Sequence, residues 1–124
     1  MTPEQIRQLV EHLDRITVPA VREAYLYLTH HAETLTHYRC GPGQHGDVRD
    51  FRYEQGETWP FSFIVNQKSL LLYFRLAGLK NPAASVSQLQ REFDEVRENP
   101  AGEITVRIST LEDAQRVAER VFGS

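Results

Sequence analysis

The sequence predicts a single α+β domain over residues 1–124, in which helices pack mainly on one face of an antiparallel sheet of three or four strands. Two apolar runs between residues 59 and 76 are separated by a short polar turn, which is typical of a β-hairpin. Residues 103–108 alternate polar and apolar side chains as a strand does, and amphipathic segments flank both features. A chain of 124 residues has the usual size for one domain with one core.

Two helices are predicted at the N-terminal end. Thr2 is a suitable N-cap, Pro3 fits the first helical position, and Gln5 completes a capping box. We expect this helix to end near Thr17 because Pro19 disfavours helical geometry in the residue before it, and a second helix to begin at Pro19. Apolar residues at helical spacing define the predicted buried faces: Ile6, Leu9, Val10, Leu13 and Ile16 in the first helix, and Val21, Ala24, Tyr25 and Leu28 in the second.

The section from residue 30 to residue 58 has the weakest pattern. Glycine and proline at 41–43, glycine and aspartate at 46–47, and the polar run at 54–57 predict turns. Residues 48–53 between them are expected to form a short edge strand beside the hairpin, because both of its faces carry charge.

The hairpin is predicted to consist of strands 59–66 and 69–76. One face is apolar and is expected to be buried, with Phe61, Phe63, Val65, Leu70, Leu72, Phe74 and Leu76. The opposite face is half polar, with Ser62, Asn66, Leu71, Tyr73 and Arg75. Gly78 and the pair Asn81–Pro82 are expected to close this unit.

A helix, a strand and a second helix are predicted to follow. Ser87 and Gln90 form a possible capping box for a helix whose apolar stripe is Val86, Leu89, Phe93 and Val96. After a turn at 99–102 and the strand at 103–108, Thr110 is placed to cap the last helix, and Gly123 to end it. The inward residues of that helix are Ala114, Val117, Ala118 and Val121.

Composition and charge favour a cytoplasmic location without membrane contact. The single cysteine excludes an intramolecular disulfide, which fits a reducing compartment. The N-terminal segment lacks the basic and apolar regions of a secretory signal, and the longest apolar run, Leu70–Phe74, is too short to span a bilayer. The net charge of −3 argues against wholesale binding of nucleic acid.

The charge is unevenly distributed, and this suggests a contact surface on the hairpin. No acidic residue occurs from residue 58 to residue 91, so the hairpin region is locally positive. The candidate binding residues are Arg52, Trp59, Lys68, Tyr73 and Arg75. Basic groups interleaved with aromatic rings on an open sheet stack bases and neutralise phosphates, although sheet aromatics more often serve packing. We therefore expect a non-catalytic binding or accessory module without a cofactor, whose partner is nucleic acid, an anionic ligand or a protein.

The alternative from the sequence is a small metal-dependent enzyme that uses residues 30–47. His37, Cys40 and His45 are donors that zinc or iron accepts, around a Gly-Pro-Gly turn. Their spacing matches no standard zinc motif, and the glycines after Cys40 do not predict the helix N-terminus that activates a nucleophilic thiol. The chain contains neither a dinucleotide-binding glycine motif nor a P-loop.

Residues 59–122 resemble the YdhG-like (frataxin-like) bacterial domains of unknown function and related modules found beside restriction and modification enzymes. The segments that carry this likeness are FSFIVNQKSLLLYFRL and GEITVRISTLEDAQRVAERVF. The resemblance implies a compact α+β sandwich with a binding role and transfers no catalytic residue. A homodimer through the sheet edge or the uncovered face is a further alternative, since Leu71 and Tyr73 would otherwise meet water there.

Overall fold

The computed structural model describes residues 2–75 and 86–123, and for Gln44, His45 and Val86 it describes the backbone alone. Within these ranges the chain forms four helices and six strands, which confirms the α+β class and exceeds the three or four strands predicted. The elements are α1 Pro3–Arg15, α2 Pro19–Ala32, β1 Arg39–His45, β2 Val48–Gln55, β3 Thr58–Val65, β4 Leu70–Phe74, α3 Val86–Glu92, β5 Val96–Glu98, β6 Ile104–Ile108 and α4 Leu111–Phe122.

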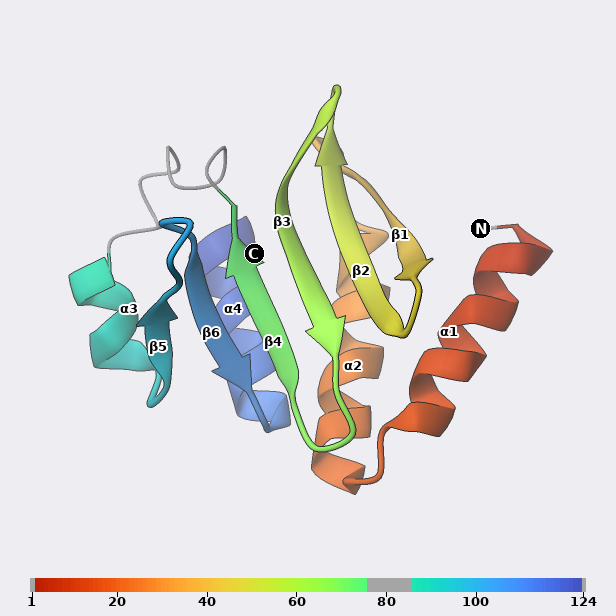
Figure 1. The fold of residues 1–124 in the computed structure, drawn as a ribbon, viewed down its shortest axis with the longest axis horizontal. Coiled ribbons are helices and arrows are strands. Elements are labelled where there is room, and N and C mark those ends of the chain that lie inside the picture. The colour runs from red at the N-terminus through yellow and green to blue at the C-terminus, as the bar shows by residue number, and fades with distance from the viewer. Residues whose placement is uncertain (1, 76–85, 124) are drawn as a thin grey trace.

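The strands form one open sheet in the order β1-β2-β3-β4-β6-β5, and every neighbouring pair is antiparallel. Helices α2 and α4 lie together behind the sheet, whereas α1 runs beside the β1 edge and α3 lies beyond the β5 edge (Figure 1). In the described part of the chain, no helix covers the front face of the sheet (Figure 1). The fold is therefore a sheet with one dry face and one open face.

Both N-terminal helices are confirmed, but α1 is placed differently from the prediction. The Thr2 side chain accepts a hydrogen bond from the Gln5 amide, and the Gln5 side chain accepts one from the Thr2 amide, so the capping box is present. Ile6 and Val10, which were expected to be buried, are 52% and 51% exposed. Because α1 lies at the edge of the sheet, only part of its apolar stripe meets the core.

The predicted turn at 41–43 is wrong, because these residues belong to strand β1. Their register is Gly41 opposite Arg52, Pro42 opposite Phe51 and Gly43 opposite Asp50. A proline cannot donate to a sheet ladder, and β1 tolerates one because it is an edge strand. As a consequence β2 is an interior strand and not the predicted edge, and its Phe51 and Tyr53 are buried.

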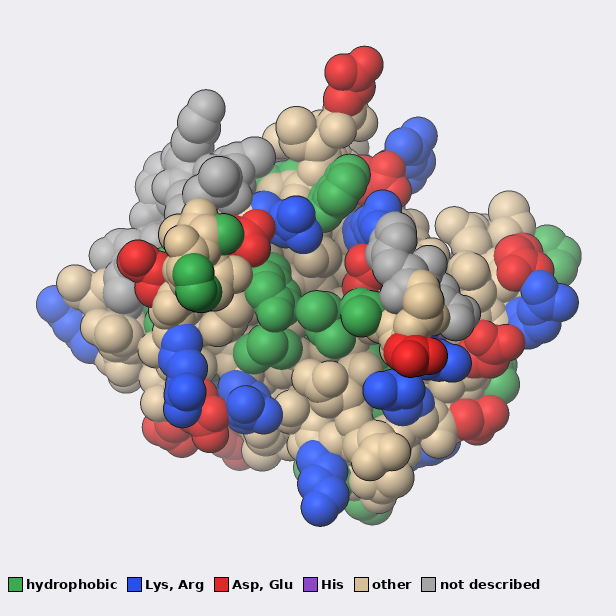
Figure 2. Space-filling view, viewed as in Figure 1, with side chains coloured by type: hydrophobic (Ala, Val, Ile, Leu, Met, Phe, Trp, Pro, Cys, Tyr) green, Lys and Arg blue, Asp and Glu red, His purple; other side chains and the backbone are tan. Residues whose placement is uncertain are grey.

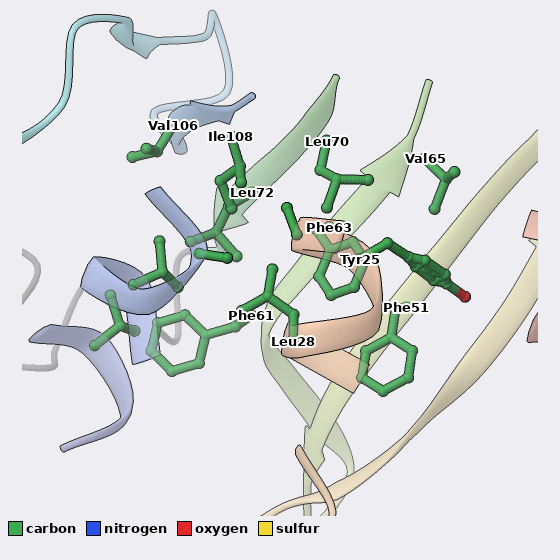
Figure 3. Close-up of a cluster of buried hydrophobic side chains, with 14 of the residues drawn as sticks. Tyr25, Leu28, Phe51, Phe61, Phe63, Val65, Leu70, Leu72, Val106 and Ile108 are labelled. Atoms are coloured by element: carbon green, nitrogen blue, oxygen red, sulfur yellow. The ribbon is translucent and has the colours of Figure 1, made fainter. Parts of the chain in front are cut away.

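The predicted hairpin is confirmed in strands β3 and β4. Phe61 pairs with Phe74, and Phe63 pairs with Leu72, on the face that α2 covers. Tyr25 and Leu28 of α2 point into this cluster of buried side chains (Figure 3). The predicted roles of Leu76, Gly78 and Asn81–Pro82 lie outside the described residues.

The C-terminal elements follow the prediction except between residues 86 and 98. Ser87 lies inside α3 and so is not its N-cap, and Val96 begins the short strand β5 instead of continuing the helix. Strand β6 and helix α4 are confirmed. The Thr110 side chain accepts from the Asp113 amide, and Gly123 ends α4 in the left-handed region with φ 75°.

Candidate functional site

A β-bulge places Trp59 on the open face of the sheet. Tyr53 pairs with Phe61, whereas Gln55 pairs with Thr58, so β3 contains one more residue than β2 between these two pairs. Strict alternation would put Trp59 on the buried side with Phe61. The extra residue reverses the alternation, as bulges do when they redirect a side chain. The only tryptophan of the chain therefore lies beside side chains of the open face.

The residues around Trp59 line a hollow of about 360 Å³ on the open face. We call this the open-face hollow, and its lining residues are Val48, Asp50, Arg52, Trp59, Ser62, Ile64, Tyr73 and Arg75. Hydrophobic side chains gather over β3 and β4 in the middle of this face, and Lys and Arg side chains lie beside them (Figure 2). Its volume is in the range of small-molecule sites. Four of the five predicted binding residues meet here.

Two guanidinium groups lie over the Trp59 ring. The Cζ atom of Arg52, on β2, is 4.6 Å from the ring centroid, and that of Arg75, which follows β4, is 5.4 Å from it. The arginines approach from the two strands that flank β3. Attraction between a cation and the electron-rich face of an indole holds such groups together.

Each of these arginines is also paired with a carboxylate. Arg52 Nε donates to Asp50 Oδ2 at 3.0 Å, and Arg75 Nε lies 3.1 Å from Glu103 Oε2. Asp50 precedes Arg52 by two residues on the same strand, and Glu103 reaches Arg75 because β6 lies next to β4. Of the basic residues between 58 and 91, Arg75 is thus neutralised by an acid from outside that segment.

The arginines nevertheless determine what the hollow presents to solvent. The Arg52 side chain is 21% exposed against 11% for Asp50, and the Arg75 side chain is 41% exposed against 14% for Glu103. In both pairs the arginine side chain is more exposed than the carboxylate side chain with which it pairs. The surface is therefore rich in hydrogen-bond donors although the two pairs together carry no net charge.

Lys68 is the predicted binding residue that does not join this group. It lies in the turn between β3 and β4, where the Asn66 amide donates to the Ser69 carbonyl oxygen at 3.0 Å. Trp59 lies near the opposite end of β3, so the length of the hairpin separates the two residues. Lys68 is exposed and stands apart from the hollow.

The sequence prediction missed Asp50 and Glu103 as members of the site. The spacing of Asp50 and Arg52 places both on one face of a strand, so their pairing could have been found from the alternation alone. Glu103 had no local signal, because its contact with Arg75 depends on which strand lies next to β4.

Strand β1 separates the residues proposed as metal ligands. Cys40 is its second residue and residue 45 its last, so about 16 Å of extended chain divides them at 3.3 Å per residue. His37 is exposed before the strand begins. Among the described residues, no group of three or more His, Cys, Asp or Glu side chains is arranged to hold a metal ion.

Cys40 is in surroundings that suppress thiol chemistry. It pairs with the buried Tyr53 across the β1–β2 ladder and packs against the core. Burial, with a further contribution from the charge of Glu54, raises the pKa of the Cys40 thiol to about 12. A nucleophilic or metal-binding cysteine needs the thiolate, which this environment disfavours.

None of the protein-family models compared with the chain matches it. No curated protein sequence and no solved structure matches it either. The resemblance to the YdhG-like domains remains a prediction. Among the described helices, none has the length and apolar character needed to cross a bilayer.

Proposed function

We propose that the protein is a non-catalytic binding module whose contact surface is the open sheet face around Trp59. The observation that carries this proposal is the position of Trp59, which a bulge in β3 turns away from the core and toward two arginines. A large aromatic ring contributes most to stability when it is buried. An arrangement that directs it to an uncovered face, inside a hollow with donor groups, supports a role in recognition.

Three classes of partner fit an open face of this kind: single-stranded nucleic acid, an anionic ligand, and a second copy of the chain. The aromatic and guanidinium groups support the first two classes. The half-buried residues Ile64, Leu71 and Tyr73 of strands β3 and β4 support the third. All three classes would contact the same part of the sheet, so one mapping experiment tests whether the open face is the binding surface.

The test is a chemical-shift mapping of the ¹⁵N-labelled protein. It is titrated separately with a mixed-sequence single-stranded oligonucleotide, with small aromatic anions and, as a dilution series, with itself. We expect at least one titration to shift amides of β2, β3 and β4 whose side chains point to the open face, such as those of Arg52, Ser62 and Tyr73. The substitution Trp59→Leu should lower the affinity for whichever titrant produces these shifts.

The control residue is Lys68, which is exposed but far from the hollow. Lys68→Gln should leave the affinity for that titrant unchanged. If no titrant shifts the amides of the open face, or if all shifts cluster around residues 30–47 instead, the proposed function is overturned.

A further inference from the structure

We propose that the open-face hollow binds an aromatic ring that carries a single anionic group, as in a nucleoside monophosphate or an aromatic carboxylate. This inference rests on the proposed function and names the ligand class of the same site. Three features of the hollow carry it: its apolar wall, its outward donor groups and the carboxylates beneath them.

The wall favours a flat apolar body. Trp59 and Tyr73 contribute aromatic surface, and Val48 and Ile64 contribute branched aliphatic surface. Val48 is 43% exposed, so apolar surface there is left in contact with water. A planar ring placed against these groups removes that surface from water and stacks against an aromatic side chain.

The donors favour an anion on that ring. Arg52 and Arg75 each use Nε for the ion pair with their own carboxylate. Within the described ranges, the terminal amino groups of both guanidinium groups form no hydrogen bond. The ion pairs hold the two groups in place, so binding an anion costs little further ordering of side chains. Bonds from a guanidinium to a carboxylate or phosphate are charge-assisted and strong.

The two paired carboxylates limit the charge of the ligand. Asp50 and Glu103 lie beneath the two arginines and cancel their charge at longer range. A nucleic-acid strand gains affinity from many phosphates meeting many unpaired cations. Here each arginine is already paired with a carboxylate, so an anion is attracted only at short range, by the terminal amino groups of the two guanidinium groups. One anionic group in direct contact therefore gains more from this site than an extended polyanion.

The experiment compares two acids with their neutral counterparts. Adenosine 5′-monophosphate is paired with adenosine, and 2-naphthoate with 2-naphthamide, and affinity is measured by amide shifts of the ¹⁵N-labelled protein. We expect at least one acid to bind with shifts centred on residues 52, 62 and 73, and its neutral counterpart to bind about tenfold more weakly, the effect of one charge-assisted hydrogen bond. Which acid binds separates a phosphate from a carboxylate ligand.

Two variants test the assigned contacts, and circular dichroism verifies their folding. Arg75→Gln should weaken the acid about tenfold and leave the neutral counterpart unchanged. Arg75→Lys keeps the charge beside Glu103, so it should preserve the fold and restore only part of the affinity because it lacks the planar fork. Lys68→Gln serves as the matched loss of one positive charge outside the hollow and should change neither affinity.

The inference is overturned if the neutral compounds bind as tightly as the acids, or if Lys68→Gln weakens binding as much as Arg75→Gln. It is also overturned if only the oligonucleotide or self-association shifts the open-face amides, a result that would leave the proposed function standing. If no titrant shifts them, both proposals fail.

Discussion

At the scale of single residues, two glycines in β1 illustrate how the surroundings decide the role of a residue type. A Cβ atom at Gly43 would lie 2.7 Å from Asp50 Oδ1, which belongs to a side chain held by Arg52. A Cβ atom at Gly41 would lie 2.9 Å from Nε2 of Gln5, the far end of a flexible side chain. Gly43 therefore maintains the geometry of the Asp50–Arg52 pair, and Gly41 has no comparable constraint.

The matched substitutions Gly43→Ala and Gly41→Ala test this difference. Gly43→Ala should lower the free energy of unfolding by about 1–3 kcal/mol, because the methyl group displaces a buried carboxylate and its partner. Gly41→Ala should change it by less than about 0.5 kcal/mol, since Gln5 can rotate away. Urea denaturation followed by circular dichroism measures both, and equal effects would show that Asp50 moves freely.

At the scale of elements, one polar side chain connects α1 to the rest of the fold. His12 is the buried residue of α1, with 1% exposure, although Ile6 and Val10 of the same helix are largely exposed. Its Nδ1 lies 2.8 Å from Tyr25 Oη of α2, and its ring also hydrogen-bonds to the backbone of Gly43. We therefore expect protonation of this imidazole to weaken the docking of α1 at the sheet edge.

Burial lowers the pKa of His12 from its usual 6.5. The positive charge of Arg49 lowers this pKa further, whereas the hydrogen bond to Gly43 and the negative charges of Asp50 and Glu11 raise it in part. As the pH falls, His12 is therefore protonated near pH 6.5 in the unfolded chain, whereas in the folded protein it is protonated only at a lower pH. Stability is complete above that pH and decreases as the pH falls through the lowered pKa of the folded state. Burial lowers the pKa of His31 as well, so its contribution has the same sign.

We expect the free energy of unfolding, measured by urea denaturation between pH 5 and pH 8, to fall on the acidic side. His12→Gln should reduce the slope of this dependence without abolishing it, because His31 still contributes. His37 is exposed and serves as the matched control, so His37→Gln should retain the full slope. A slope that His12→Gln leaves unchanged would place the linked proton elsewhere.

At the scale of the whole molecule, a single core joins all the described elements. The buried cluster includes side chains from α2, α3, α4 and strands β2, β3, β4 and β6, and partly buried side chains of α1, β1 and β5 pack against it. Aromatic rings from distant parts of the chain meet in it, and Phe122 of α4 stacks on Tyr53 of β2 with their centroids 4.4 Å apart. The N-terminal and C-terminal halves share this core and should not unfold separately.

This predicts a single cooperative transition. Trp59 is the only tryptophan, so its fluorescence reports on the open face, while far-ultraviolet circular dichroism reports on all elements. In urea the two signals should change with the same midpoint, as they do when no intermediate is populated. An earlier fluorescence midpoint would mean that the open-face hollow is lost before the core.

The hairpin, α1, α2, β6 and α4 were predictable because each has a strong local pattern of side chains or an explicit cap. The same holds for the grouping of Arg52, Tyr73 and Arg75, which follows from alternation along strands. The position of Trp59 was not predictable from alternation, because the bulge that redirects it exists only relative to the pairing with β2. The central residues of strand β1 were predicted to form a turn because glycine and proline usually mark turns and loops.

The sequence by itself therefore determined the helices, the central hairpin and which of its faces is apolar, since these depend on residues within a few positions of one another. Only the tertiary structure decided the six-strand order, the neutralising contact of Glu103 with Arg75 and the separation of Cys40 from residue 45. Such features depend on which strands become neighbours. That choice is made by the burial of the whole core, a property that no short segment contains.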